Sequence, residues 1–151
     1  MGFLDDLKAK ASEVKTGLVT EAKRFKNKDF HTAVVAACAL IAYADGEVSA
    51  DEKKKMAGFM QVNDAMKIFD INTTIEIFNK YIQQMEFDLD IGRSEALTAI
   101  AKLSGKAAEA RTVVRLAGAI GAADGDFDDS EKAAVRTICN ELSLDATEFG
   151  L

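Results

Sequence analysis

Apolar residues recur at spacings of three and four along most of this chain, and no segment shows the strict alternation typical of a strand. Between residues 3 and 27 the apolar stripe is interrupted by charged residues, which predicts one amphipathic helix that is mildly basic toward its end. We expect it to pack on the rest of the domain; an arm resting on a membrane surface or in a partner groove is the alternative. The stripe consists of Leu4, Leu7, Ala11, Val14, Leu18, Ala22 and Phe25.

The remaining pattern predicts a succession of helices separated by glycines and capping residues. The expected caps are Asp29 for the second helix, Ser49 with Glu52, Asn72 or Thr73, Asp88 or Asp90, Asp128 with Glu131, and Asp145 with Glu148. The expected helices cover about 29–43, 49–62, 73–87, 92–103, 106–123 and 128–142, with short turns at about 64–69 and 145–148.

Two segments of this series resemble each other. Ala44–Lys53 and Ala123–Lys132 share the pattern Ala-Asp-Gly, an acidic residue and a closing Glu-Lys, with five of ten residues identical, and Val34–Ile41 aligns with Val113–Ile120 at the same spacing. Each copy follows the order helix, acidic turn, helix, with copies at about 29–62 and 108–142. The sequence therefore predicts an internal pseudo-twofold repeat.

Composition supports a helical fold. The chain has 151 residues, 48% of them hydrophobic, and no proline. This amount of apolar sequence can form one sizeable core, and the residue usage favours helices throughout. We therefore expect an all-α bundle of seven or eight helices, in which an N-terminal amphipathic helix (1–28) packs on a helical domain (29–151).

The charge is divided unevenly. The net charge is −6, but residues 1–28 contain seven Lys/Arg against four Asp/Glu, and residues 29–151 contain twelve against twenty-one. The main body is therefore near −9, which disfavours nucleic acid and suits cations or basic surfaces. The longest apolar run, Ala33 to Ala44, is too short to span a bilayer, and the start lacks a basic signal region. We expect a soluble cytoplasmic protein.

Catalytic chemistry finds little support in the sequence. Cys38 and Cys139 lie at apolar helix positions far apart, so we expect them to be buried free thiols. His31 has no second histidine or suitably spaced cysteine with which to form a zinc site. A metal-dependent hydrolase would need both acidic turns to share a dinuclear site. We expect no enzymatic activity.

The two acidic turns carry the functional signal. Helix capping accounts for Glu52 and Glu131, because carboxylates are favourable at helix N-termini. Capping does not account for Asp45 and Asp124, which follow the C-terminal ends of apolar helices, where the backbone field is already negative. The first turn is followed by three lysines at 53–55, whereas the second has only Lys132 directly after it.

A positively charged ligand would relieve this excess of negative charge. A divalent cation such as Ca²⁺, Mg²⁺ or Mn²⁺ prefers oxygen ligands of this kind, although the turns do not match an EF-hand. A basic partner surface would serve equally well, and caps and solvated loops alone are the structural alternative. The expected metal ligands are Asp45, Glu52, Asp124 and Glu131. The expected acidic partner surface comprises Glu47, Asp126, Asp128, Asp129, Asp88 and Asp90.

The paired Ala-Asp-Gly turns, the tract Phe87–Gly92 and the closing Asp145–Leu151 together resemble the TerB family of tellurite-resistance proteins. The resemblance implies an all-helical cytoplasmic protein of the tellurite-resistance and stress-response system, without known enzymatic activity. It also implies metal binding through the repeated turns, which the lysines at 53–55 would weaken in the first copy. The implied role is an adaptor between a TerC-like membrane protein and TerD-like calcium-binding proteins, which would bring the chain to the inner face of the cytoplasmic membrane. A purely structural interaction module without a metal site is the alternative.

Overall fold

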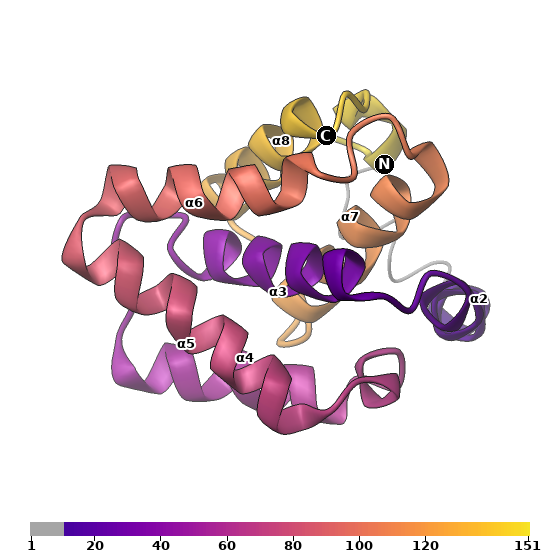
Figure 1. Cartoon of the computed structure of the whole chain (residues 1–151), viewed down its shortest axis with the longest axis horizontal. Coiled ribbons are helices and arrows are strands. Elements are labelled where there is room, and N and C mark those ends of the chain that lie inside the picture. Colours follow the sequence, from indigo (N-terminus) through magenta and orange to yellow (C-terminus); the bar gives the residue numbers. More distant parts are fainter. Residues whose placement is uncertain (1–10) are drawn as a thin grey trace.

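The computed structural model describes the backbone of residues 11–151 and the side chains from residue 17 onward. This part of the chain is all-α, and its elements are labelled as in Figure 1. In chain order they are α2 (Ala11–Arg24), α3 (Lys28–Ala42), α4 (Ala50–Val62), the 3₁₀ helix η1 (Met66–Ile68), α5 (Ile71–Phe87), α6 (Leu89–Ala101), α7 (Ala107–Gly121), α8 (Asp129–Glu141) and the 3₁₀ helix η2 (Ala146–Phe149).

Helix α3 lies in the middle of the bundle, between α6 on one side and α4 and α5 on the other, and it also packs against α7 and α8 (Figure 1). Its sequence is apolar on every face, as expected for a helix surrounded by protein. All residues from Ala33 to Ile41 are buried. The many alanines in this run keep the helix thin, so that its neighbours can pack closely around it.

Two glycines mark close contacts between elements. A Cβ atom on Gly121 of α7 would lie 3.0 Å from Ile41 Cγ2 of α3, so this glycine brings the two central helices together. A Cβ atom on Gly92 of α6 would lie 2.5 Å from backbone atoms of Met85 in α5. Both crossings therefore depend on the absence of a side chain at these positions.

Helix α2 packs against α7 and η1. Leu18 and Ala22 are buried, and Thr112 of α7 donates a hydrogen bond to Glu21 Oε2 at 2.7 Å. The predicted helix began at residue 3; residues 3–10 lie outside the described part, as do Leu4 and Leu7 of its apolar stripe.

Several predicted caps are replaced by a neighbouring residue of similar chemistry. Asn27, not Asp29, caps α3, with its Oδ1 accepting from Phe30 N at 2.9 Å. Asp70, not Asn72 or Thr73, caps α5. The predicted caps Ser49, Asp88, Asp128 and Asp145 do cap their helices. Among the described residues, no helix has the length and apolar character needed to cross a membrane.

Candidate functional site: a pocket between the two acidic turns

The two acidic turns have the same local structure. The bounds of α7 and α8 lie 79 residues after those of α3 and α4. In each turn a glycine adopts a positive φ, 92° at Gly46 and 87° at Gly125. Each of these glycines donates its N–H to a carbonyl three residues earlier at 2.9 Å, at the end of the preceding helix. The positive φ explains the glycine, because other residues rarely adopt it.

The aspartate before each glycine stabilises its own turn. Asp45 Oδ1 accepts from Glu47 N at 3.2 Å, and Asp124 Oδ1 accepts from Asp126 N at 3.0 Å. These are the local side-chain bonds that Asp often makes to the backbone two residues on. They supply a structural role for both aspartates that the sequence did not reveal, and within residues 17–151 the second carboxylate oxygen of each has no hydrogen-bond partner.

The helices after the turns begin differently. Ser49 Oγ accepts from Glu52 N at 3.1 Å and donates to Glu52 Oε1 at 3.2 Å. At the second turn, Asp128 Oδ1 accepts from Glu131 N at 2.8 Å while Glu131 Oε1 accepts from Asp128 N at 3.1 Å, which completes a capping box. A carboxylate pair thus replaces a serine and a glutamate in the second copy.

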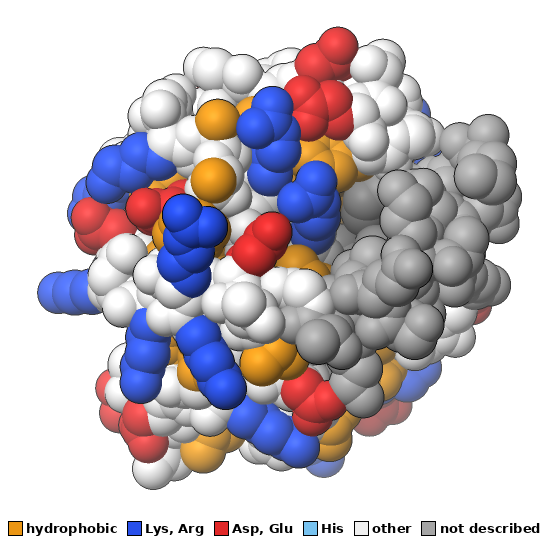
Figure 2. All heavy atoms as spheres, turned by 90° about the vertical axis from the view of Figure 1, so that its right-hand side faces the viewer, with side chains coloured by type: hydrophobic (Ala, Val, Ile, Leu, Met, Phe, Trp, Pro, Cys, Tyr) orange, Lys and Arg blue, Asp and Glu red, His pale blue; other side chains and the backbone are white. Residues whose placement is uncertain are grey.

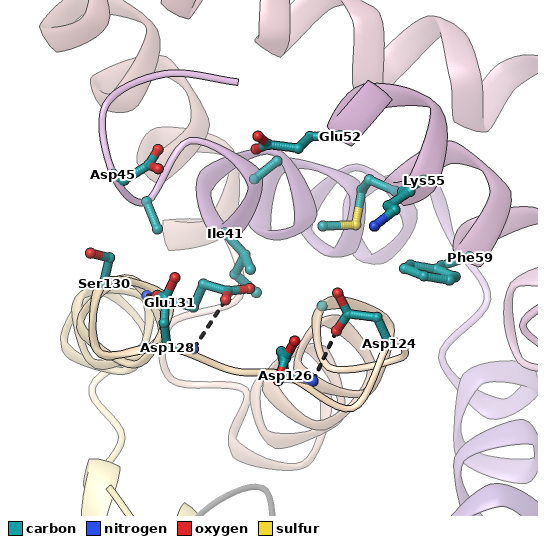
Figure 3. A pocket seen from close by; sticks show the side chains of 14 residues that line it. Ile41, Asp45, Glu52, Lys55, Phe59, Asp124, Asp126, Asp128, Ser130 and Glu131 are labelled. Atoms are coloured by element: carbon teal, nitrogen blue, oxygen red, sulfur yellow. Dashed lines mark hydrogen bonds between the residues drawn. The ribbon is translucent and has the colours of Figure 1, made fainter. Parts of the chain in front are cut away.

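All four predicted metal ligands line one pocket. Figure 3 shows Asp45 and Glu52 on one side of it and Asp124 and Glu131 on the other. The pocket has a volume of about 270 Å³, and Ile41, Met56 and Phe59 provide its apolar lining. The fold therefore brings the turns together although they lie 79 residues apart in the sequence.

Few positive charges compensate the carboxylates of this pocket. Within the described part of the chain, none of the four forms an ion pair with Lys or Arg. Lys53 is engaged elsewhere, because its Nζ lies 2.9 Å from Glu86 Oε1. Lys55, in contrast, lines the pocket and lies on the side of Glu52 (Figure 3).

Glu131 is a pocket carboxylate with a raised pKa. Its pKa is raised from 4.5 to about 7, mainly by burial and also by the negative charges of Asp128, Asp124 and Asp126, while its backbone hydrogen bond at Asp128 lowers the pKa. A carboxyl group with this pKa is partly protonated at neutral pH. A cation entering the pocket would favour its ionised form.

The carboxylates are chemically suited to a hard cation, but they are not gathered around one point. Among the described residues, no three acidic, histidine or cysteine side chains are arranged to hold a metal ion. Glu52 and Glu131, like the two aspartates, each use one oxygen in a local hydrogen bond of the turn. Direct coordination by three carboxylates would thus require side-chain rotation across the pocket.

Two of the other predicted acidic residues lie in the pocket, and four lie outside it. Asp126 and Asp128 line the pocket, whereas Glu47 and Asp129 are exposed residues of the turns outside its lining. Asp88 is the cap of α6, and Asp90 is an exposed residue of its first turn. Sequence reasoning missed Ser130 and the apolar lining, and it did not distinguish Lys55, which lines the pocket, from the neighbouring Lys53 and Lys54, because only the folded arrangement shows what faces the carboxylates.

The remaining reactive groups have structural surroundings. His31 is buried, stacks on Phe69 with ring centroids 4.0 Å apart, and shares a 2.7 Å hydrogen bond with Thr74. Burial lowers its pKa. Cys38 and Cys139 are buried free thiols, as predicted, and burial raises their pKa values to about 12 and about 11.

The fold and the pocket define an all-α protein with two similar helix–acidic turn–helix units facing one another. The sequence model of the family described as "Tellurite resistance protein TerB" matches residues 31–151. The tellurium resistance protein TerB of Alcaligenes sp. is 37% identical over 116 residues, which cover 77% of this chain and 95% of that protein. The chain therefore belongs to the TerB family, as the sequence motifs indicated. No solved structure matched the chain.

Proposed function

We propose that this chain is a non-catalytic component of the tellurite-resistance and stress-response system. Its acidic pocket binds a divalent cation, a basic segment of a partner protein, or a partner protein through a bridging divalent cation. One observation carries the proposal: Asp45, Glu52, Asp124 and Glu131 from both turns line the same pocket. Their oxygen ligands and net negative charge favour Ca²⁺, Mg²⁺ or Mn²⁺ over softer metals.

Only some of the carboxylates in this pocket would contact the cation directly. The side chains are spread around the pocket, and hard cations commonly retain water molecules that bridge to carboxylates. We therefore expect weak binding rather than a tightly closed metal centre. The same arrangement also suits a lysine or arginine side chain, whose aliphatic stem could lie on Met56 and Phe59 while its charge meets the carboxylates.

The partners that we propose follow from the family. An adaptor with an acidic pocket could join a TerC-like membrane protein to TerD-like calcium-binding proteins, with the chain in the cytoplasm at the inner face of the membrane. A cation held between two acidic surfaces would make such a contact dependent on divalent metal. No nucleic acid is expected among the partners, because the main body of the chain is strongly acidic.

A calorimetric or NMR titration with Ca²⁺, Mg²⁺, Mn²⁺ and Zn²⁺ tests the cation-binding part of the proposal. We expect weak binding of a hard cation that Asp124→Ala/Glu131→Ala abolishes, whereas Asp90→Asn, which changes an exposed carboxylate outside the pocket, leaves it intact. If no metal produces heat or chemical-shift changes, only the partner-protein version of the proposal survives.

The partner-protein version has its own measurement. Capture experiments with the cytoplasmic segments of the TerC-like protein and with the TerD-like proteins should show binding that the Asp124→Ala/Glu131→Ala variant weakens. A purely structural module is the competing function. It predicts a melting temperature independent of divalent cations and partner binding that is indifferent to the pocket carboxylates.

A further inference from the structure

A strip of four basic residues lies at the junction between α2 and α3, on the face shown in Figure 2. The strip consists of Lys23, Arg24, Lys26 and Lys28, all exposed, with Phe25 between them. Lys and Arg side chains are prominent on this face, and acidic side chains also lie among and beside them (Figure 2). The acidic pocket lies at the opposite end of α3, at Ile41 and Ala42, and between the turns before α4 and α8.

The basic strip is not neutralised within the described part of the chain. None of its four cations forms an ion pair there, and Arg24 lies over the ring of Phe25 at 5.6 Å. The two nearest acids in the sequence are engaged elsewhere. Glu21 accepts from Thr112 and lies 4.0 Å from Arg115, and Asp29 lies 4.0 Å from Lys102.

Helix electrostatics explain only half of the basic strip. Lys23 and Arg24 occupy the last turn of α2, where the helix dipole favours cations. Lys26 lies beyond that helix, and Lys28 is the first residue of α3, where the dipole disfavours a positive charge. The strip therefore carries more positive charge than the two helix ends require.

The backbone of the basic strip is already ordered. Lys26 N donates to Lys23 O at 3.4 Å, and Asn27 Nδ2 donates to Phe25 O at 2.9 Å while Asn27 Oδ1 caps α3. The half-buried Phe25 ring lies 6.2 Å from the ring of Phe30, a buried residue of α3. A partner would thus meet four cations on a preformed turn, so that binding involves no entropic cost of ordering the backbone.

We propose that the basic strip is a peripheral contact for an anionic lipid membrane. Clusters of four or more Lys/Arg beside an amphipathic helix suit anionic headgroups, and each cation contributes about fivefold to binding. A flat lipid surface can contact several of the four exposed cations, whereas the 270 Å³ acidic pocket of a second copy accommodates only a side chain or two.

Vesicle flotation with the full chain tests this contact independently of the acidic pocket, because a chelator in every sample prevents metal bridging. We expect binding to vesicles that contain phosphatidylglycerol and not to pure phosphatidylcholine, with loss of binding when salt rises from about 0.1 M to about 0.5 M. Lys23→Gln/Lys26→Gln/Lys28→Gln should lower the partition coefficient about a hundredfold, and the corresponding triple Lys→Arg variant should retain it.

The matched control removes three exposed cations from other elements, in Lys54→Gln/Lys80→Gln/Arg136→Gln. We expect it to bind vesicles within about twofold of the original chain, since only charges close to the lipid surface contribute strongly. Circular dichroism checks that all variants fold. The proposal is overturned if the full chain ignores anionic vesicles at low salt, if the control loses as much binding as the strip variant, or if sedimentation shows that the strip instead drives salt-sensitive self-association.

Discussion

The two acidic turns share a backbone and differ in charge. Both use a glycine with positive φ and an aspartate that bonds the N–H two residues on. The first turn faces Lys55 and begins its helix with a serine, whereas the second gathers Asp124, Asp126 and Asp128 around Glu131. The comparison teaches that the glycine and the first aspartate specify the turn, while the surrounding residues set the field in the pocket.

Cation affinity should separate the turns most strongly. Asp124→Asn/Glu131→Gln should lower the affinity for the hard cation by more than about tenfold, because it removes the carboxylates in the more negative half of the pocket. Asp45→Asn/Glu52→Gln, which changes the same positions of the first turn, should lower it less. Calorimetric titration of the two double variants gives the comparison, and equal losses would show that the turns contribute symmetrically.

Removing the caps should affect stability more at the second turn. Asp128→Ala breaks a complete capping box and should cost about 1–2 kcal/mol, whereas Ser49→Ala should cost about 0.5–1 kcal/mol. Asp128→Ser keeps a capping oxygen and removes a negative charge near Glu131, so it should be at least as stable as the original chain. Urea unfolding measures all three, and a destabilised Asp128→Ser variant would contradict the repulsion inferred around Glu131.

The pH dependence of stability should come from the second turn. Folding raises the pKa of Glu131 from 4.5 to about 7, so the folded protein binds more protons than the unfolded chain between these values. Stability should therefore fall as the pH rises through this window and level off above about pH 7. Since Glu131 is partly exposed, we expect about 1 kcal/mol, or about 2–4 °C in melting temperature.

Thermal unfolding of two isosteric variants at several pH values shows whether the pH dependence of stability comes from Glu131. Glu131→Gln should remove the change between about pH 5 and pH 7.5, and Glu52→Gln should keep it because Glu131 is still present. Cation affinity in the original chain should also weaken on acidification through the same window, because protons compete for Glu131. A Glu131→Gln variant with an unchanged pH profile would assign the titration to another group.

The smallest effect concerns Lys55, which occupies the place of Ala134 in the second unit. Its positively charged ammonium group competes with a bound cation for the carboxylates of the pocket. Lys55→Met keeps an apolar stem of similar length and should raise cation affinity about two- to fivefold. Lys54→Met changes an adjacent exposed lysine that does not line the pocket, and it should have little effect.

Helix positions and the internal spacing of the turns could be predicted from the sequence because they depend on residues close together in the chain. Asn27 and Asp70 were missed as caps since Asp29 and Thr73 are equally good cap types a few residues away, and spacing alone does not choose between them. Glu148 was assigned to a capping box, but Arg111 takes both of its oxygens, at 2.8 and 3.2 Å. That ion pair joins residues 37 apart, which no local pattern indicates.

The sequence indicated which carboxylates belong to the candidate site, but not that they meet in one pocket. The conflict between Asp45 or Asp124 and the preceding helix end drew attention to the right carboxylates, although their turn hydrogen bonds explain part of that conflict. That both sets line one pocket depends on how α3 and α7 cross at Gly121 and Ile41. The close contact at Gly92 likewise became visible only in three dimensions.

The burial of the two cysteine sulfur atoms bears on how a member of a tellurite-resistance family could react with an oxyanion. Thiolates, not thiols, are the nucleophiles, and with pKa values of about 12 and about 11 only on the order of one molecule in ten thousand or fewer would carry either anion at neutral pH. A tellurium compound approaching the folded protein thus meets carboxylates and ammonium groups, and no sulfur from Cys38 or Cys139. Any direct reduction would have to wait for local opening of the bundle, which makes this chain poorly suited to act as a sacrificial reductant.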